Sequence, residues 1–83
     1  MSDQNKLEIL RVISKTASLG NPERFSFNSL TKTLSLSKED LDVLLTELKR
    51  NRFITEYKQK GVDGFIVTLA QKGLDAVEDE SFI

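Results

Sequence analysis

The clearest hydrophobic pattern in the chain lies between Ser37 and Ile54. Its leucines recur at spacings of three, four and seven residues, as they do along one side of an α-helix. They are Leu41, Leu44, Leu45 and Leu48. Ser37 precedes a charged run, and a serine at this place accepts a hydrogen bond from an N–H group of the first helical turn. We therefore predict a helix over Lys38 to Asn51 whose leucine side faces a core.

The opposite side of this helix is polar apart from one valine, and it is the side that would touch a binding partner. Its residues are Glu39, Asp42, Val43, Thr46 and Arg50. A basic cluster of Lys49, Arg50 and Arg52 lies at or just beyond the C-terminal end, where positive charge interacts favourably with the helix dipole.

A first helix is predicted from Asp3 to Ser18. Its main apolar stripe consists of Leu7, Leu10, Ile13 and Ala17. Ile9 and Val12 lie outside that stripe, so the apolar arc is broader than a simple surface helix shows. Two interpretations remain open: a central helix that is touched on two sides, or a face formed by Ile9 and Val12 that binds a partner, including a second copy of the chain.

Gly20 to Pro22 are expected to end the first helix. The alternation in Arg24 to Phe27 then predicts a short strand or extended segment. Asn28 is expected to cap a second, short helix over Ser29 to Leu34, and Leu36 to fill the corner before the leucine helix.

After Arg52 the pattern changes to alternation, which predicts two strands over residues 53–59 and 65–69. The intervening segment 60–64 contains two glycines and an Asp-Gly pair, which favour a hairpin turn. A last helix is predicted from Ala70 or Gln71 to Glu78, and the acidic tail 78–83 is expected to fray.

Composition limits the classes of protein to consider. The chain has 83 residues, of which 39% are hydrophobic and 30% charged, as expected for one globular domain over residues 1–83. It contains neither cysteine nor histidine, so a disulfide scaffold, a zinc site and a Ser/His triad are excluded. No apolar run is long enough for a membrane span, and residues 1–10 lack a signal-peptide pattern. We expect a cytoplasmic protein that does not enter membranes.

Two segments carry a resemblance to a known family. The segment FSFNSLTKTLSLSKEDLDVLLTELKRNRFI resembles the short helix, leucine-filled corner and recognition helix of winged helix-turn-helix domains. The segment VTLAQKGLDAV is similar to the strand-to-helix passage of bacterial winged-helix transcription regulators. The resemblance implies an α+β, mainly α fold: a three-helix core, a β-hairpin wing and a short C-terminal helix.

The same resemblance implies a small transcription regulator that binds double-stranded DNA and is expected to be a homodimer. Helix 38–51 would enter the major groove while hairpin 54–69 acts as the wing. The residues expected to face the bases are Lys38, Asp42, Thr46 and Arg50. Those expected to contact phosphates are Lys32, Lys49, Arg52, Lys58 and Lys60.

The charges leave a second function open. Residues 37–50 contain three basic and four acidic side chains, and the isoelectric point of about 5.4 is low for a DNA-binding domain that acts alone. The alternative is a winged-helix protein-interaction module that docks through Val43 and the neighbouring acids, or through Ile9 and Val12. An enzyme is not expected, because no histidine activates the serines and no glycine-rich phosphate loop is present. No cofactor and no metal site are expected, since the acidic pairs lack the pattern of a calcium loop.

Overall fold

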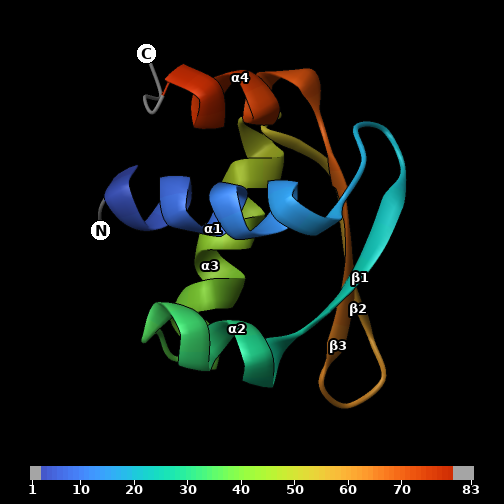
Figure 1. Cartoon of the computed structure of the whole chain (residues 1–83). Coiled ribbons are helices and arrows are strands. Elements are labelled where there is room, and N and C mark those ends of the chain that lie inside the picture. Colours follow the sequence, from blue (N-terminus) through green and yellow to red (C-terminus); the bar gives the residue numbers. More distant parts are fainter. Residues whose placement is uncertain (1–2, 80–83) are drawn as a thin grey trace.

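A computed structural model of the chain describes residues 3–79. These residues form four helices and three strands: α1 (Asp3–Thr16), β1 (Pro22–Ser26), α2 (Phe27–Leu34), α3 (Lys38–Arg50), β2 (Ile54–Lys60), β3 (Gly64–Leu69) and α4 (Gln71–Asp79). The predicted α+β, mainly helical class is confirmed (Figure 1). Of the acidic tail, residues 78 and 79 belong to α4, whereas residues 80–83 lie outside the described residues.

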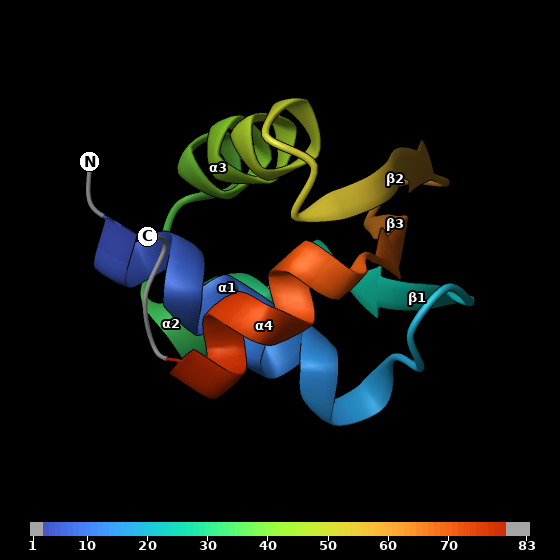
Figure 2. The same ribbon diagram turned by 90° about the horizontal axis from the view of Figure 1, so that it is seen from above.

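The helices gather on one side of a small antiparallel sheet. Figure 2 shows α3 to one side of the overlapping helices α1 and α4, with the strands next to one end of this helical group. The strand order is β1-β3-β2, so the predicted hairpin of β2 and β3 is confirmed and β3 lies in the middle. The predicted strand at Arg24 to Phe27 is shifted, because Phe27 already belongs to α2.

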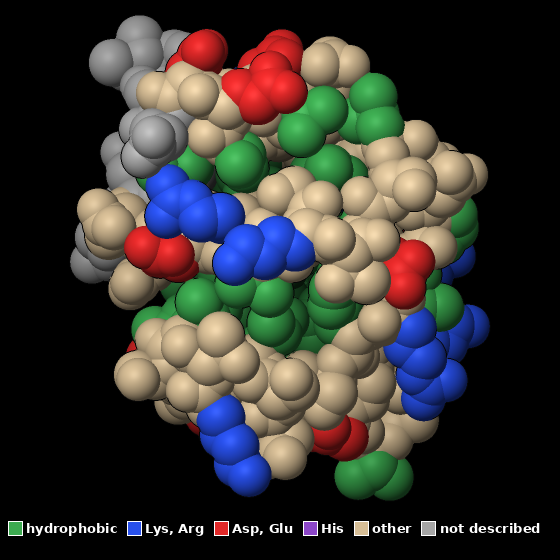
Figure 3. Space-filling model, viewed as in Figure 1, with side chains coloured by type: hydrophobic (Ala, Val, Ile, Leu, Met, Phe, Trp, Pro, Cys, Tyr) green, Lys and Arg blue, Asp and Glu red, His purple; other side chains and the backbone are tan. Residues whose placement is uncertain are grey.

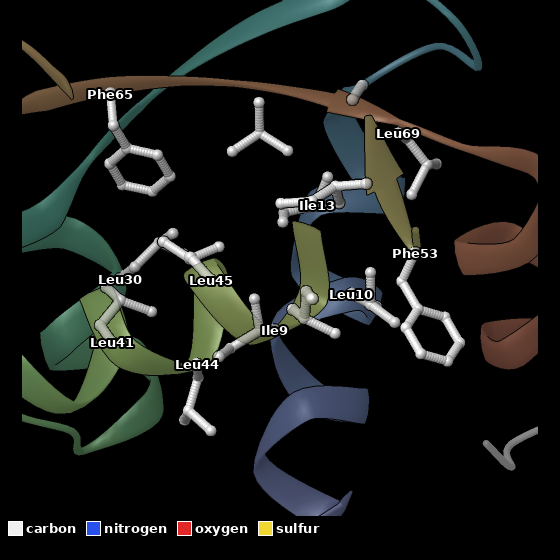
Figure 4. Packing of buried hydrophobic residues seen from close by; sticks show 14 of the residues in the cluster. Ile9, Leu10, Ile13, Leu30, Leu41, Leu44, Leu45, Phe53, Phe65 and Leu69 are labelled. Carbon is white, nitrogen blue, oxygen red and sulfur yellow. The ribbon is translucent and has the colours of Figure 1, made fainter. Parts of the chain in front are cut away.

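One hydrophobic core joins all these elements. The four leucines of the predicted stripe are buried, as expected: Leu41, Leu44, Leu45 and Leu48. Figure 4 shows apolar side chains of α1, α3 and the strands meeting in this core. Phe65 of β3 closes it on the sheet side, with its ring centre 4.5 Å from that of Phe27.

The partner face predicted on the first helix is wrong for Ile9, which is completely buried. Val12 is partly buried and packs against the same core. The reason is that α1 is the central helix, in contact with α2, α3 and α4, so its broad apolar arc serves several neighbours of the same chain.

The N-terminus of α2 is capped differently from the prediction. Ser26, not Asn28, is the N-cap residue, and its hydroxyl accepts a hydrogen bond from the N–H of Ser29. Asp63 in the hairpin turn supplies further acceptors: its carboxylate binds the N–H of Asn28 at 3.1 Å and the hydroxyl of Ser26, and its carbonyl binds the N–H of Phe27 at 2.8 Å. The hairpin tip is therefore attached to the start of α2 (Figure 1).

The last helix approaches the chain that leaves α3. A side chain at Gly73 would place its Cβ 2.2 Å from the carbonyl oxygen of Phe53, so only glycine allows this contact between backbones. Lys72 adds to it, since its ammonium donates to the carbonyl of Asn51 at 2.9 Å and lies 4.5 Å from the ring centre of Phe53.

The cap supplied by Asp63 leads to a stability prediction. Asp63→Ala should lower the free energy of unfolding by about 1 kcal/mol, the usual effect of losing a helix N-cap acceptor, whereas Asp63→Asn should lower it less because the amide oxygen still accepts. Urea unfolding followed by circular dichroism measures both values. Glu78→Ala, an exposed position in α4, removes the same charge and should leave stability nearly unchanged. Equal stability of the Asp63→Ala variant and the unsubstituted protein would contradict the assigned cap.

Candidate functional site

The outward side of α3 is not covered by the rest of the described chain. With the leucine side buried, the residues Glu39, Val43, Thr46, Lys49 and Arg50 are exposed. Val43 is 46% exposed near the middle of this side. In Figure 2, α3 lies at the edge of the helical group, so one flank of the helix is open. The predicted separation of an inner and an outer side is thus present, and the outer side is available to a partner.

The side chain of Asp42 is half-buried, and its carboxylate contacts another part of the protein as well as solvent. The hydroxyl of Tyr57 in β2 donates to its carboxylate at 2.5 Å. Burial raises the pKa of Tyr57, and the hydrogen bond to the negative Asp42 raises this pKa further. Asp42 therefore joins α3 to β2. Because one of its carboxylate oxygens already accepts from Tyr57, Asp42 has less capacity to accept a hydrogen bond from a DNA base than predicted.

The first turn of α3 forms a shallow hollow with β2. It is lined by Lys38, Glu39, Asp42 and Gln59. The ammonium group of Lys38 lies 5.1 Å from the ring centre of Phe27, where the face of the ring attracts a cation. Lys38 and Thr46, two of the residues expected to face bases, are both exposed on α3, and the Thr46 hydroxyl donates to the carbonyl of Asp42 at 2.8 Å.

The C-terminal end of α3 is more basic than a count along the sequence suggests. Glu47 pairs with Lys6 of α1, with 2.8 Å between the ammonium nitrogen and a carboxylate oxygen. This hydrogen bond lowers the pKa of Glu47, so the acid stays ionised and its charge is balanced from within the protein. The nearby cations Lys49, Arg50 and Arg52 are all exposed.

The two lysines predicted for the hairpin do not face the same way as α3. In β2 the side chains alternate between the two faces of the sheet. Tyr57 and Gln59 lie on the face toward α3, since Tyr57 binds Asp42 and Gln59 lines the hollow. Lys58 and Lys60 are exposed on the other, outer face, where Lys58 lies 3.3 Å from Glu56. Because β2 is the edge strand next to α3, both lysines still lie close to the outward side of α3.

The remaining predicted contact residue, Lys32, is exposed in the last turn of α2. This helix lies beside the start of α3 (Figure 1), at the opposite end from Lys49 and Arg50. The predicted phosphate contacts therefore do not form one cluster, but are spread over α2, the end of α3 and the outer face of the sheet.

Three residues that shape the surface formed by α3 and the sheet were not predicted from the sequence. Tyr57 orients β2 against α3, Arg24 adds a cation to the sheet, and Val62 is 94% exposed at the hairpin tip. The alternation around Arg24 was recognised, but its position relative to the lysines depends on strand pairing, which a single sequence does not show.

Comparisons with known proteins add no family: no family model, no curated protein and no solved structure matches this chain. Across residues 3–79, no group of three or more acidic side chains is placed to hold a metal ion. No helix within these residues is long and apolar enough to cross a membrane.

The contact between Tyr57 and Asp42 can be tested by titration, because Tyr57 is the only tyrosine and the chain has no tryptophan. Tyrosinate absorbance of the folded protein should rise at a pH well above the ordinary tyrosine pKa of about 10. Asp42→Asn should lower this pKa, yet leave it above the ordinary value because burial is the larger cause. An unchanged pKa in this variant would contradict the assigned hydrogen bond.

The same pKa shift has a consequence for stability. Since folding raises this pKa, the contribution of Tyr57 is complete below about pH 10 and is lost as the pH rises toward the folded-state pKa. Tyr57→Phe should lower the free energy of unfolding by about 1 kcal/mol at neutral pH, a value reduced by partial exposure to solvent. The difference between the two proteins should shrink above pH 10, as measured by urea unfolding across that range.

Proposed function

We propose that this chain is a winged helix-turn-helix domain that binds duplex DNA and acts as a small transcription regulator. The order of helices and strands is the order that the family resemblance implies. The observation that carries the proposal is the outward side of α3, which is exposed beside a paired hairpin while the leucine side is buried. A helix held in this way is suited to lie in a major groove.

The distribution of charge supports contact through the second half of α3. Lys49 and Arg50 are exposed there, and Arg52 follows directly. Of the acids on this helix, Glu47 is balanced by Lys6 and Asp42 is bound to Tyr57. The other two, Glu39 and Asp40, are in the first turn, where negative charge stabilises a helix N-terminus. Positive charge therefore faces a phosphate backbone mainly at the C-terminal end of α3.

The edge strand β2 extends this surface toward the sheet. It has a neighbour on one side only, since the strand order is β1-β3-β2. Lys58 and Lys60 project from it on the outer face, from which their long side chains can reach a backbone that passes the edge. In this proposal the outward side of α3 contacts bases, whereas Lys49 and Arg52 at its C-terminal end and the lysines of β2 contact phosphates. The partner face left open on the first helix takes no part in the proposal, because Ile9 is completely buried.

A second candidate function is a protein-interaction module of the same fold. The supporting observation is Val43, which is 46% exposed on the middle of the outward side and has acidic neighbours on α3. A partner with an apolar residue ringed by basic side chains would fit this region. This function predicts that duplex DNA does not bind at any salt concentration.

Fluorescence anisotropy with a labelled duplex of mixed sequence tests the DNA proposal. The logarithm of the binding constant should fall linearly with the logarithm of salt concentration, with a slope of about −0.9 for each phosphate contact. Lys49→Gln, at an exposed position expected to contact a phosphate, should weaken binding and should reduce the magnitude of the slope by about 1.

The matched control is Lys15→Gln. Lys15 is exposed in the last turn of α1, and its substitution removes the same charge from a helix that packs on the inner side of α3. Binding by this variant should equal that of the unsubstituted protein. If the unsubstituted protein fails to bind the duplex at low salt, the DNA proposal is wrong and the protein-interaction function takes its place.

A further inference from the structure

We infer that the outer face of the sheet is a phosphate-binding surface centred on Arg24, which holds the backbone of a DNA duplex next to the part contacted by α3. This inference rests on the proposed function and adds a strand, β1, that the winged-helix resemblance did not include in the contact. We call this surface the outer sheet face; it consists of Arg24, Lys58, Lys60, Gly64 and Ile66.

Strand register brings these residues together. Arg24 of β1 is paired with Ile66 of β3, and Ile66 is paired with Lys58 of β2. Gly64 is paired in the same way with Ser26 and Lys60. Because neighbouring strands are about 4.8 Å apart, Arg24 and Lys58 start from points about 10 Å apart on the same face.

The opposite face of the sheet carries aromatic side chains that pack on the core. The outer sheet face must therefore point away from the core. The ring centres of Phe25 and Phe65 are 5.8 Å apart, as are those of Tyr57 and Phe65. Since side chains alternate along each strand, the neighbours Arg24, Ile66 and Lys58 project away from the core. Basic side chains gather at the side of the molecule where the sheet lies (Figure 3).

The guanidinium group of Arg24 occupies the space that a side chain at position 64 would otherwise fill. A Cβ on Gly64 would lie 2.9 Å from Nη2 and 3.0 Å from Nε of Arg24, so the guanidinium rests on β3 directly over this glycine. Within residues 3–79, Arg24 has no ion pair or side-chain hydrogen bond. Its planar group of N–H donors is thus free to bind a phosphate with two parallel hydrogen bonds.

The outer sheet face keeps a positive charge after the two acids beside it are considered. Asp63 precedes Gly64 in the chain, and its carboxylate binds the Ser26 hydroxyl and the N–H of Asn28. Glu56 is next to Lys58 at 3.3 Å and accepts from the Thr68 hydroxyl at 3.1 Å. These hydrogen bonds lower the pKa of Glu56, so it remains ionised and balances Lys58. Arg24 and Lys60 remain without an acidic partner in the described part of the chain.

The shape and position of this surface favour a nucleic-acid backbone over an acidic segment of a protein. Within the face itself the only large apolar side chain is the half-buried Ile66, and the exposed Val62 lies beyond it at the hairpin tip, so the centre of the face has no apolar anchor of the kind that protein interfaces need. Separate cations spread over one face of a sheet match the regularly spaced phosphates of DNA. The surface also meets the α3 side along β2, so one duplex can touch both.

Arg24→Gln tests the inference, because glutamine keeps two of the three methylene groups of the side chain and removes the charge. Anisotropy with the mixed-sequence duplex should show weaker binding and a slope against salt that is smaller in magnitude by about 1. Arg24→Lys restores the charge and should recover most of the slope. Lys15→Gln is the control of equal charge and should match the unsubstituted protein.

The outcomes separate this inference from the proposed function. If the unsubstituted protein binds DNA and Arg24→Gln matches Lys15→Gln in affinity and slope, the outer sheet face is not a phosphate site, although the proposed function stands. If the unsubstituted protein does not bind DNA, both fail. Binding of a poly-glutamate peptide that depends on Arg24, with DNA binding unaffected by the substitution, would also overturn the inference. Circular dichroism of each variant verifies that it is folded.

Discussion

The burial of one side of α3 is the constraint on which the rest of the structure depends. Its four leucines meet apolar side chains from α1, α2 and the sheet in a single core, and each buried leucine contributes about 1.5–3 kcal/mol relative to an exposed one. Rotation of α3 about its axis would expose several of these leucines at once. The polar side must therefore point outward, whatever it binds there.

Two polar contacts then determine how the hairpin is oriented relative to that helix. Tyr57 joins the middle of β2 to Asp42 of α3, and Asp63 joins the hairpin tip to the start of α2. The hairpin is thus held along its length and at its end, so that Tyr57 and Gln59 face α3 while the lysines face outward. The same arrangement makes the exposed side of α3 less acidic than its sequence. The carboxylate of Asp42 accepts a hydrogen bond from Tyr57, and the charge of Glu47 is balanced by Lys6.

Much of the local structure could be predicted from the sequence. The leucine spacing predicted α3 and its buried side, and Ser37 was correctly expected to cap it. The segment 60–64 correctly indicated a hairpin, although Gly61 adopts the left-handed turn conformation and Gly64 already belongs to β3. These features depend on residues within one or two helical turns or on a single tight turn, so the information lies in adjacent residues. The exposed side of α3, including Thr46 and Arg50, could be named for the same reason.

Contacts between distant residues were decided only by the tertiary structure. The Asp63 cap joins residues 35 apart in the chain, and neither that pairing nor the register of Arg24 with Ile66 is visible in local periodicity. Burial of Ile9 likewise depends on how many helices surround α1. The sequence alone thus determined which residues form each element and which side of α3 is apolar. The tertiary structure decided which face of the sheet carries the cations, because a side chain's face depends on register, and a shift by one residue reverses it.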